Sequence, residues 1–225
     1  MLAWRKSKWM HSMRHHEKTP SVVVALVACV LGFAVVAPAQ DRLPPISADQ
    51  MTAEQKKAVA DFKAARGAEL SGPFYPLLRS PEVMTRARAM GDYLRYNSAL
   101  PPRLSEFVIL LTASQWAQQY EWAIHHPIAL KEGVSPEAAT AIAEGRRPAQ
   151  MSDDEEALYD FCIELQRTHL VSDATYARML ARFGERGVVD TVGIVGYYTM
   201  LAMALNTFRT PAPPGATPAP FPTRP

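Results

Sequence analysis

PPRLSEFVILLTASQ, residues 101–115, is the stretch that decides the fold. Two prolines open it, which suits the first turn of a helix, and the residues that follow are so densely apolar that a helix here must be buried on most sides. Helix signals also dominate the rest of the chain, and no strand signal accompanies them. We therefore expect an all-α domain of about seven to eight helices around this central segment.

The helices expected before the central segment have clear boundaries. Residues Thr52–Gln55 have the spacing of a capping box and open a helix that Gly67 ends. Ser80, followed by Pro81, is expected to cap a helix that reaches about Tyr96. The turn between these two helices is rich in glycine and proline.

The helices expected after the central segment are marked by caps and by apolar periodicity. Gly193 and Gly196 in the last of them suit close helix–helix contact, either inside one subunit or at a subunit interface. The expected helical segments are 115–131, 136–144, 152–170, 172–183 and 187–208.

The first forty residues have the layout of a signal peptide. Five basic residues precede a charge-free apolar run over residues 22–36, which is shorter than the ~20 residues of a membrane-spanning helix. Small residues at Ala37–Ala39 suit cleavage, so we expect residues 1–40 to be removed and the protein to be periplasmic or secreted. An uncleaved segment, or lipidation at Cys29, would instead anchor the chain to a membrane.

The remaining chain divides into a domain over 41–209 and a tail over 210–225. Residues 41–225 carry 19 basic and 21 acidic side chains, a net charge of −2, with no basic stripe, so nucleic-acid binding is excluded. Seven prolines in the tail predict an extended, disordered segment. Cys162 is the single cysteine left after cleavage, which excludes an internal disulfide and suits a buried small side chain.

Candidate chemistry gathers in residues 115–126, QWAQQYEWAIHH. Glu121 and His125 are four apart on an expected helix, so a carboxylate can orient an imidazole for acid–base work. The alternative is an ordinary surface pair. The aromatic side chains of Trp116, Tyr120 and Trp122 favour a less polar setting, in which such groups titrate in a useful range.

Glu106 is the second candidate carboxylate. It stands directly before the apolar run Phe107–Leu111, where a buried acid needs a partner, and His125 could be that partner. The alternative is an acid placed in the first turn by the helix dipole. A metal site built from Glu106, Glu121 and His125 is a weaker reading, because His126 points about 100° away from His125 around the helix.

Several of these segments resemble the carboxymuconolactone decarboxylase family, which includes the alkylhydroperoxidase D type. The resemblance covers roughly residues 70–208. It implies an all-helical fold and a homo-oligomer, usually a trimer or hexamer. The segments that carry it are GPF at 72–74, LLRSPE at 77–82, PRLSEFVIL at 102–110, YEW at 120–122, His125 and GYY at 196–198.

The resemblance also bears on redox chemistry. Relatives of the alkylhydroperoxidase D type use a glutamate, two cysteines three apart and a histidine, at positions that correspond to Glu106, Gln118, Glu121 and His125. Both cysteines are missing here, so no thiolate is present to attack a peroxide. Thiol peroxidase activity is therefore disfavoured.

The non-thiol branch of the family implies an enzyme, a carboxy-lyase-like lyase or isomerase that needs no cofactor and acts on a small carboxylated lactone or related organic acid. By that resemblance His125 is the acid or base, Glu121 or Glu106 orients it, and an arginine such as Arg79 holds a substrate carboxylate. Tyr120, Trp122, Trp116 and Phe74 are expected to line the site. The alternatives are a non-catalytic binding or assembly module and, less favoured, a peroxidase-related oxidoreductase.

Overall fold

The computed structural model describes residues 40–222, and the regular secondary structure in that range is entirely helical. This confirms the expected all-α fold and the number of its helices. The predicted signal segment, with Cys29, falls outside the described residues. The eight helices are α1 (Ala53–Arg66), α2 (Phe74–Leu77), α3 (Pro81–Tyr96), α4 (Pro102–Gln115), α5 (Gln119–Lys131), α6 (Pro136–Ala143), α7 (Asp153–Thr168) and α8 (Asp173–Phe208).

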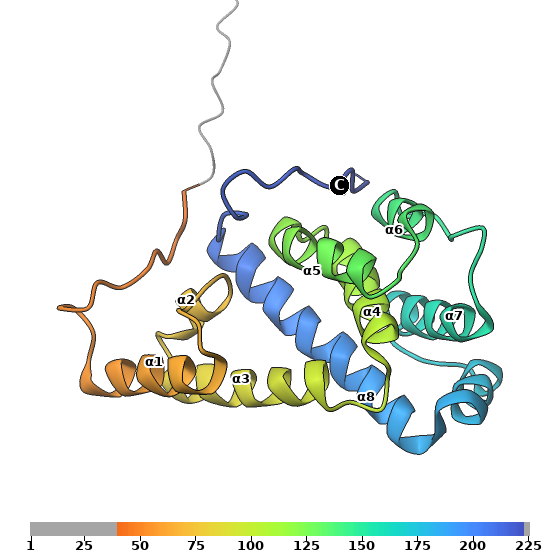
Figure 1. The fold of residues 1–225 in the computed structure, drawn as a ribbon, viewed down its shortest axis with the longest axis horizontal. Helices are drawn as coiled ribbons and strands as arrows, with labels where there is room; N and C mark the ends of the chain where they lie inside the picture. The colour runs from red at the N-terminus through yellow and green to blue at the C-terminus, as the bar shows by residue number, and fades with distance from the viewer. Residues whose placement is uncertain (1–39, 223–225) are drawn as a thin grey trace, which may run out of the picture. The chain divides into compact units, whose positions relative to one another are not determined.

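Helix α4 forms the core of the domain, as its sequence predicts. Every residue from Leu104 to Ser114 is buried, because α4 packs against α5, α6, α7 and α8 (Figure 1). Phe107 and Leu110 have no exposed surface, and burial of each such side chain contributes about 2 kcal/mol. A second, smaller apolar cluster joins α1, α2 and α3 around Phe62 and Phe74.

A turn separates α4 from α5, where the sequence predicted an uninterrupted helix from residue 115. Ala117 has a positive φ of 47°, and the side chain of Gln118 caps α5 by accepting a hydrogen bond from the backbone N–H of Tyr120. Alanine seldom takes this conformation and glutamine is an uncommon cap, so the local sequence carries no turn signal. The turn packs α5 beside α4, which brings two polar side chains together inside the domain.

Helix α8 is interrupted at Gly184, whose φ of 64° and ψ of 177° are not helical. This confirms that two helical segments meet here. Among the residues that the structure describes, α8 is the one helix long and apolar enough to cross a membrane by length and composition alone. Because 56% of its most apolar window is buried inside the protein and α8 packs on α3, α4 and α7, its apolar character is explained as that of a core helix.

Two glycines allow α3 and α8 to approach each other closely. A Cβ atom on Gly91 would lie 2.2 Å from the hydroxyl oxygen of Tyr197, and one on Gly193 would lie 3.0 Å from Leu94. The close contact expected at Gly193 therefore lies within the subunit. Gly196, by contrast, has open space in front of it.

The tail is extended over residues 210–222 but makes defined contacts, whereas its prolines predicted disorder. Gln119 donates to the carbonyl of Ala219 and accepts from its N–H, at 3.0 and 2.8 Å. Phe221 lies edge-on to Trp122, with ring centroids 5.3 Å apart. An extended backbone has free hydrogen-bonding groups, and a side-chain amide can pair with them without any helix or sheet.

Candidate active site

The buried carboxylate of Glu106 on α4 faces the imidazole of His125 on α5. The Oε2 atom of Glu106 lies 2.7 Å from Nδ1 of His125, and both side chains are buried. A proton on Nδ1 allows the imidazole to donate this hydrogen bond to the carboxylate. The pairing predicted for these two residues is therefore present, and it lies between two helices rather than at the surface.

Glu121 approaches the other side of the same imidazole. Its Oε2 atom lies 3.6 Å from Nε2 of His125, one helical turn along α5. Glu121 is 4% exposed and His125 is 3% exposed, so the alternative of a solvated surface pair is wrong. The imidazole of His125 thus lies between two buried carboxylates.

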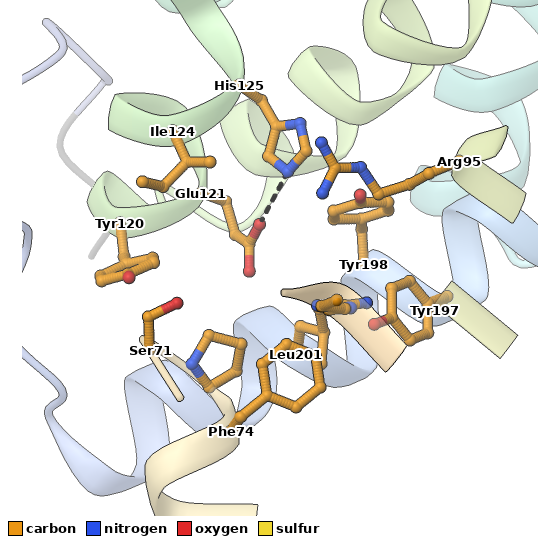
Figure 2. Close-up of a pocket in the computed structure, with 12 residues that line it drawn as sticks. Ser71, Phe74, Arg95, Tyr120, Glu121, Ile124, His125, Tyr197, Tyr198 and Leu201 are labelled. Atoms are coloured by element: carbon orange, nitrogen blue, oxygen red, sulfur yellow. Dashed lines mark ion pairs between the residues drawn. The ribbon is translucent and has the colours of Figure 1, made fainter. Parts of the chain in front are cut away.

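The environment of Glu121 favours its neutral form. Burial raises the pKa of this carboxyl from 4.5 to about 7, while the charges of His125 and Arg95 oppose the rise and Glu106 adds to it. The Oε1 atom of Glu121 is buried and has no hydrogen-bond partner among the described residues. Figure 2 shows this second oxygen turned away from His125, toward the middle of the surrounding side chains.

These groups open onto a cavity of about 100 Å³ between α3, α5, α8 and the turn before α2 (Figure 2). That volume can hold several water molecules or a small organic molecule. The side chains around it are mainly aromatic and apolar, with a few polar groups among them. The lining residues are Arg66, Ser71, Pro73, Phe74, Arg95, Tyr120, Glu121, Ile124, His125, Tyr197, Tyr198 and Leu201.

Two of the four aromatic residues expected at the site line the cavity, namely Phe74 and Tyr120. The two tryptophans do not. The indole N–H of Trp116 donates to Thr199 on α8 at 3.1 Å, and Trp122 packs between His126 and Phe221. Trp116 ends α4 before the turn, and Trp122 lies about 100° from Glu121 around α5, so neither side chain lines the cavity.

Two tyrosines of α8 complete the aromatic wall, and sequence reasoning missed both. The ring of Tyr198 meets His125 edge-on, with centroids 5.0 Å apart. Burial raises the pKa of Tyr198 well above its usual value, and burial is also the main cause that raises the pKa of Tyr197 to about 12. Both hydroxyls therefore stay protonated at neutral pH and can donate hydrogen bonds.

Arg79 does not reach the cavity, so its expected role as the carboxylate ligand is wrong in this structure. Its guanidinium donates to the backbone carbonyls of Leu43, Pro44 and Tyr75 and so holds the N-terminal segment of the domain. Arg66 and Arg95 line the cavity instead. No local sequence signal distinguishes Arg95 from other arginines on α3, because only the packing of that helix shows which face is inward.

The possible metal ligands do not converge on one point. Within residues 40–222, no group of three or more histidine, cysteine, aspartate or glutamate side chains is arranged to hold a metal ion. Each nitrogen of His125 faces a carboxylate, and His126 stacks on Trp122 with centroids 5.3 Å apart. The arrangement suits an acid–base pair better than a coordination sphere.

Cys162 is remote from this arrangement. It is fully buried on α7, and burial raises the pKa of its thiol. Gln118, which the family resemblance matches to one of the two peroxidase cysteines, donates from its side-chain amide to Asn206 at 2.7 Å. The carboxylate of Glu121 occupies the other position, so no sulfur atom lines the cavity.

No family model and no curated protein matches this sequence, but solved structures match its fold. An uncharacterized peroxidase-related protein from a Silicibacter species is 15% identical, with a TM-score of 0.65 over 81% of this chain and 97% of the other. A peroxidase-related protein from Ralstonia eutropha, described as an alkylhydroperoxidase AhpD core, is 16% identical, with a TM-score of 0.62 over 77% and 92%.

A third similar structure is that of the debrominase Bmp8 in complex with 2,3,4-tribromopyrrole. It is 10% identical, with a TM-score of 0.60 over 79% of this chain and 95% of the other. At such low identities the likeness establishes the fold and not the reaction. The comparisons therefore confirm the alkylhydroperoxidase D-like helical fold that the sequence resemblance predicted.

Proposed function

We propose that this chain, which has the alkylhydroperoxidase D-like fold, is an acid–base enzyme, a lyase or isomerase that acts on a small organic acid or lactone without a cofactor. One observation carries the proposal. The imidazole of His125 lies between Glu106 and Glu121, and the second oxygen of Glu121 is buried, unpartnered and directed into the cavity.

In this proposal Glu121 transfers the proton, and His125 holds the Glu121 carboxyl group in position. The family resemblance implies the reverse, with His125 as the acid or base and a glutamate that orients it. Both nitrogens of His125 already face carboxylates, whereas one oxygen of Glu121 remains for a substrate. With a pKa of about 7, Glu121 is present in both protonation states near neutral pH, the condition that favours acid–base catalysis. Glu106 fixes the orientation and the tautomer of the imidazole.

The chemistry needs no external electron acceptor. In an isomerisation, ionised Glu121 removes a proton from a carbon beside a conjugated carbonyl group, and the electron pair moves into the conjugated system. Glu121, whose proton exchanges with water, then returns a proton at a remote carbon. In a decarboxylation, the bond to the carboxylate breaks, carbon dioxide leaves, and the electron pair moves into the unsaturated lactone. Protonated Glu121 then delivers its proton to carbon and regains one from water.

The alternative of a thiol-based oxidoreductase has no support at this cavity. The similar solved structures include peroxidase-related proteins, but here the two cysteine positions hold Gln118 and Glu121. A non-catalytic binding module on the same scaffold would require the cavity but not a titrating carboxylate. Neither alternative requires Glu121 to transfer a proton, whereas the proposal does.

Proton transfer can be tested directly by NMR in deuterated water. The purified chain is incubated with muconolactone and with 4-carboxymuconolactone, and deuterium incorporation and carbon dioxide release are followed. We expect Glu121→Gln to lose deuterium exchange or carbon dioxide release. Glu132→Gln, which changes an exposed glutamate at the end of α5, should retain it. Saturable binding with no exchange or release would favour the binding module and overturn the proposal.

A further inference from the structure

Arg95 lies where the candidate active-site cavity meets an outer cleft. The cavity and this cleft, which has a volume of about 490 Å³, share Arg66, Ser71 and Arg95 in their linings. The outer part of the cleft is formed by α1 and by the end of α3, with Tyr96 and Asn97 at its edge. Both arginines therefore border the outer cleft as well as the cavity that Glu121 lines.

Of these two arginines, Arg66 is already occupied. Its Nε atom lies 2.8 Å from a carboxylate oxygen of Asp92. Its guanidinium also packs over the rings of Phe62 and Phe74, at 5.1 and 4.8 Å from their centroids. Arg66 therefore has a structural role that joins α1, α2 and α3.

Arg95 has no comparable partner. Within residues 40–222 it makes no ion pair and no hydrogen bond, and its Nε atom is buried and unsatisfied. Its guanidinium carbon lies 5.2 Å from the centre of the Tyr96 ring, and its charge acts on Glu106 and Glu121 without a direct ion pair to either. An unpaired guanidinium that is partly buried is costly, and a carboxylate is the group that satisfies it best.

The position and the charge of Arg95 are both fixed by its surroundings. Gly91, one turn earlier on α3, leaves no room for a Cβ atom beside the Tyr197 hydroxyl, so α3 packs closely against α8 at this point. Burial acts to lower the pKa of Arg95, but Tyr198, Tyr96 and Glu106 together outweigh it, and the net shift is upward. Arg95 therefore brings a full positive charge to the lining of the cavity, and Figure 2 shows its guanidinium group beside His125 and Tyr198.

We propose that Arg95 is the carboxylate anchor of this site: it binds the carboxylate of a small organic acid that enters from the outer cleft, and it holds the rest of the acid against Glu121. The inference rests on the proposed function, since it assigns the group that selects the substrate. Two parallel N–H donors of the guanidinium match the two oxygens of a carboxylate, so a neutral amide or ester of the same acid lacks this pairing. Arg95 is thus a specificity residue, and Glu121 is the reacting one.

The test compares acids with their neutral analogues by NMR of His125 and by calorimetry. Acetate, propionate and crotonate are titrated against the wild-type chain beside acetamide, propionamide and crotonamide. We expect at least one acid to bind saturably at millimolar concentration and its amide to bind about tenfold more weakly or worse. Equal binding of acid and amide, or no saturable binding of any acid, would overturn the assignment.

Variants separate this inference from the proposed function. Arg95→Met should weaken acid binding about tenfold or more, Arg95→Lys should weaken it less, and Arg86→Met should leave it unchanged. Arg86 is a matched control, because it lies on the same helix with its side chain 79% exposed. Glu121→Gln should abolish proton transfer but retain acid binding. If Glu121→Gln kept full turnover, the proposed function would be rejected. The assignment of Arg95 as the carboxylate anchor would still be supported if Arg95→Met lost acid binding while Glu121→Gln and Arg86→Met retained it.

Discussion

The Nδ1 atom of His125 lies 2.7 Å from the Oε2 atom of Glu106, so the helix that carries the reactive groups is tied to the core helix by one buried hydrogen bond. The two residues are 19 positions apart in the sequence and meet only because the turn at Ala117 packs α5 beside α4. The position of Glu121, one turn before His125 on α5, depends on the same contact.

Removal of the Glu106 carboxylate should therefore destabilise the domain. Glu106→Leu leaves the buried Nδ1–H of His125 without an acceptor, which should cost about 1–3 kcal/mol in the free energy of unfolding. Glu106→Gln keeps a carbonyl acceptor and should cost less. Urea unfolding of both variants, beside Glu132→Gln, measures the difference. Equal stability of Glu106→Leu and the wild type would show that this hydrogen bond does not hold the two helices together.

The raised pKa of Glu121 predicts how stability depends on pH. The pKa of the folded state, about 7, lies above the usual value of 4.5, so the folded protein binds this proton more tightly than the unfolded chain. The contribution to stability is complete below pH 4.5 and is lost as the pH rises through 7, by on the order of 3 kcal/mol. Urea unfolding of wild type and Glu121→Gln across this window should show the variant gaining relative stability as the pH rises. A constant difference between them would mean that the carboxyl keeps its ordinary pKa.

Catalysis should follow the same group. For proton abstraction by ionised Glu121, kcat/KM for deuterium exchange should rise with pH and level off above a midpoint near 7. Glu121→Asp shortens the side chain and should lower the rate while it keeps a single ionisation. Steady-state exchange from pH 3.5 to 9 tests this, and a midpoint near 4.5 would instead point to a solvated carboxylate.

Substitution by alanine should change the stability of the domain in opposite directions at Gly91 and Gly196, because Gly91 lies where α3 and α8 approach closely and Gly196 faces open space. Gly91→Ala places a Cβ atom 2.2 Å from the Tyr197 hydroxyl, so the buried Tyr197 ring or one of the two helices must shift, at a cost of about 1–3 kcal/mol. It should also displace Arg95 and weaken acid binding. Gly196→Ala meets nothing within 4 Å and should stabilise the domain by about 0.5–1 kcal/mol. Thermal unfolding and acid titration of the pair check both directions.

The two arginines at the cavity mouth should also differ in stability measurements. Arg66→Met removes an ion pair with Asp92 and packing on two aromatic rings, and should cost about 1–3 kcal/mol. Arg95→Met removes an unpaired charge that is partly buried, and should be neutral or stabilising. A large loss of stability in Arg95→Met would indicate that Arg95 serves the fold rather than a ligand.

The fold could be predicted from the sequence because its signals are local. The capping box at Thr52–Gln55 and the apolar run in α4 each specify an element without reference to the rest of the chain. The turn at Ala117 could not be predicted, because its stability comes from the packing that it permits. Glu121 and His125 were found through their helical spacing, and Glu106 through the apolar residues beside it.

Arg95 and the two tyrosines of α8 escaped prediction for a different reason. Positive charge shows that an arginine needs a partner, but it does not show which arginine faces inward. The sequence therefore does not distinguish Arg95, which lines the cavity, from Arg79, which binds backbone carbonyls. Tyr197 and Tyr198 are more than seventy residues from His125 and read as ordinary members of an apolar helix. Only the packing of α8 against α3 and α4 brings them to the site.

The carboxylate at position 121 determines whether the site can be inactivated by oxidation. A thiol in this place would pass through oxidised forms and would depend on a reducing partner to restore it. Glu121 cannot form a disulfide or a sulfenic acid, and Cys162 is shielded inside the core. Under the proposed function, the cavity would be ready for another reaction as soon as its proton had been replaced from water, with no supply of reducing equivalents.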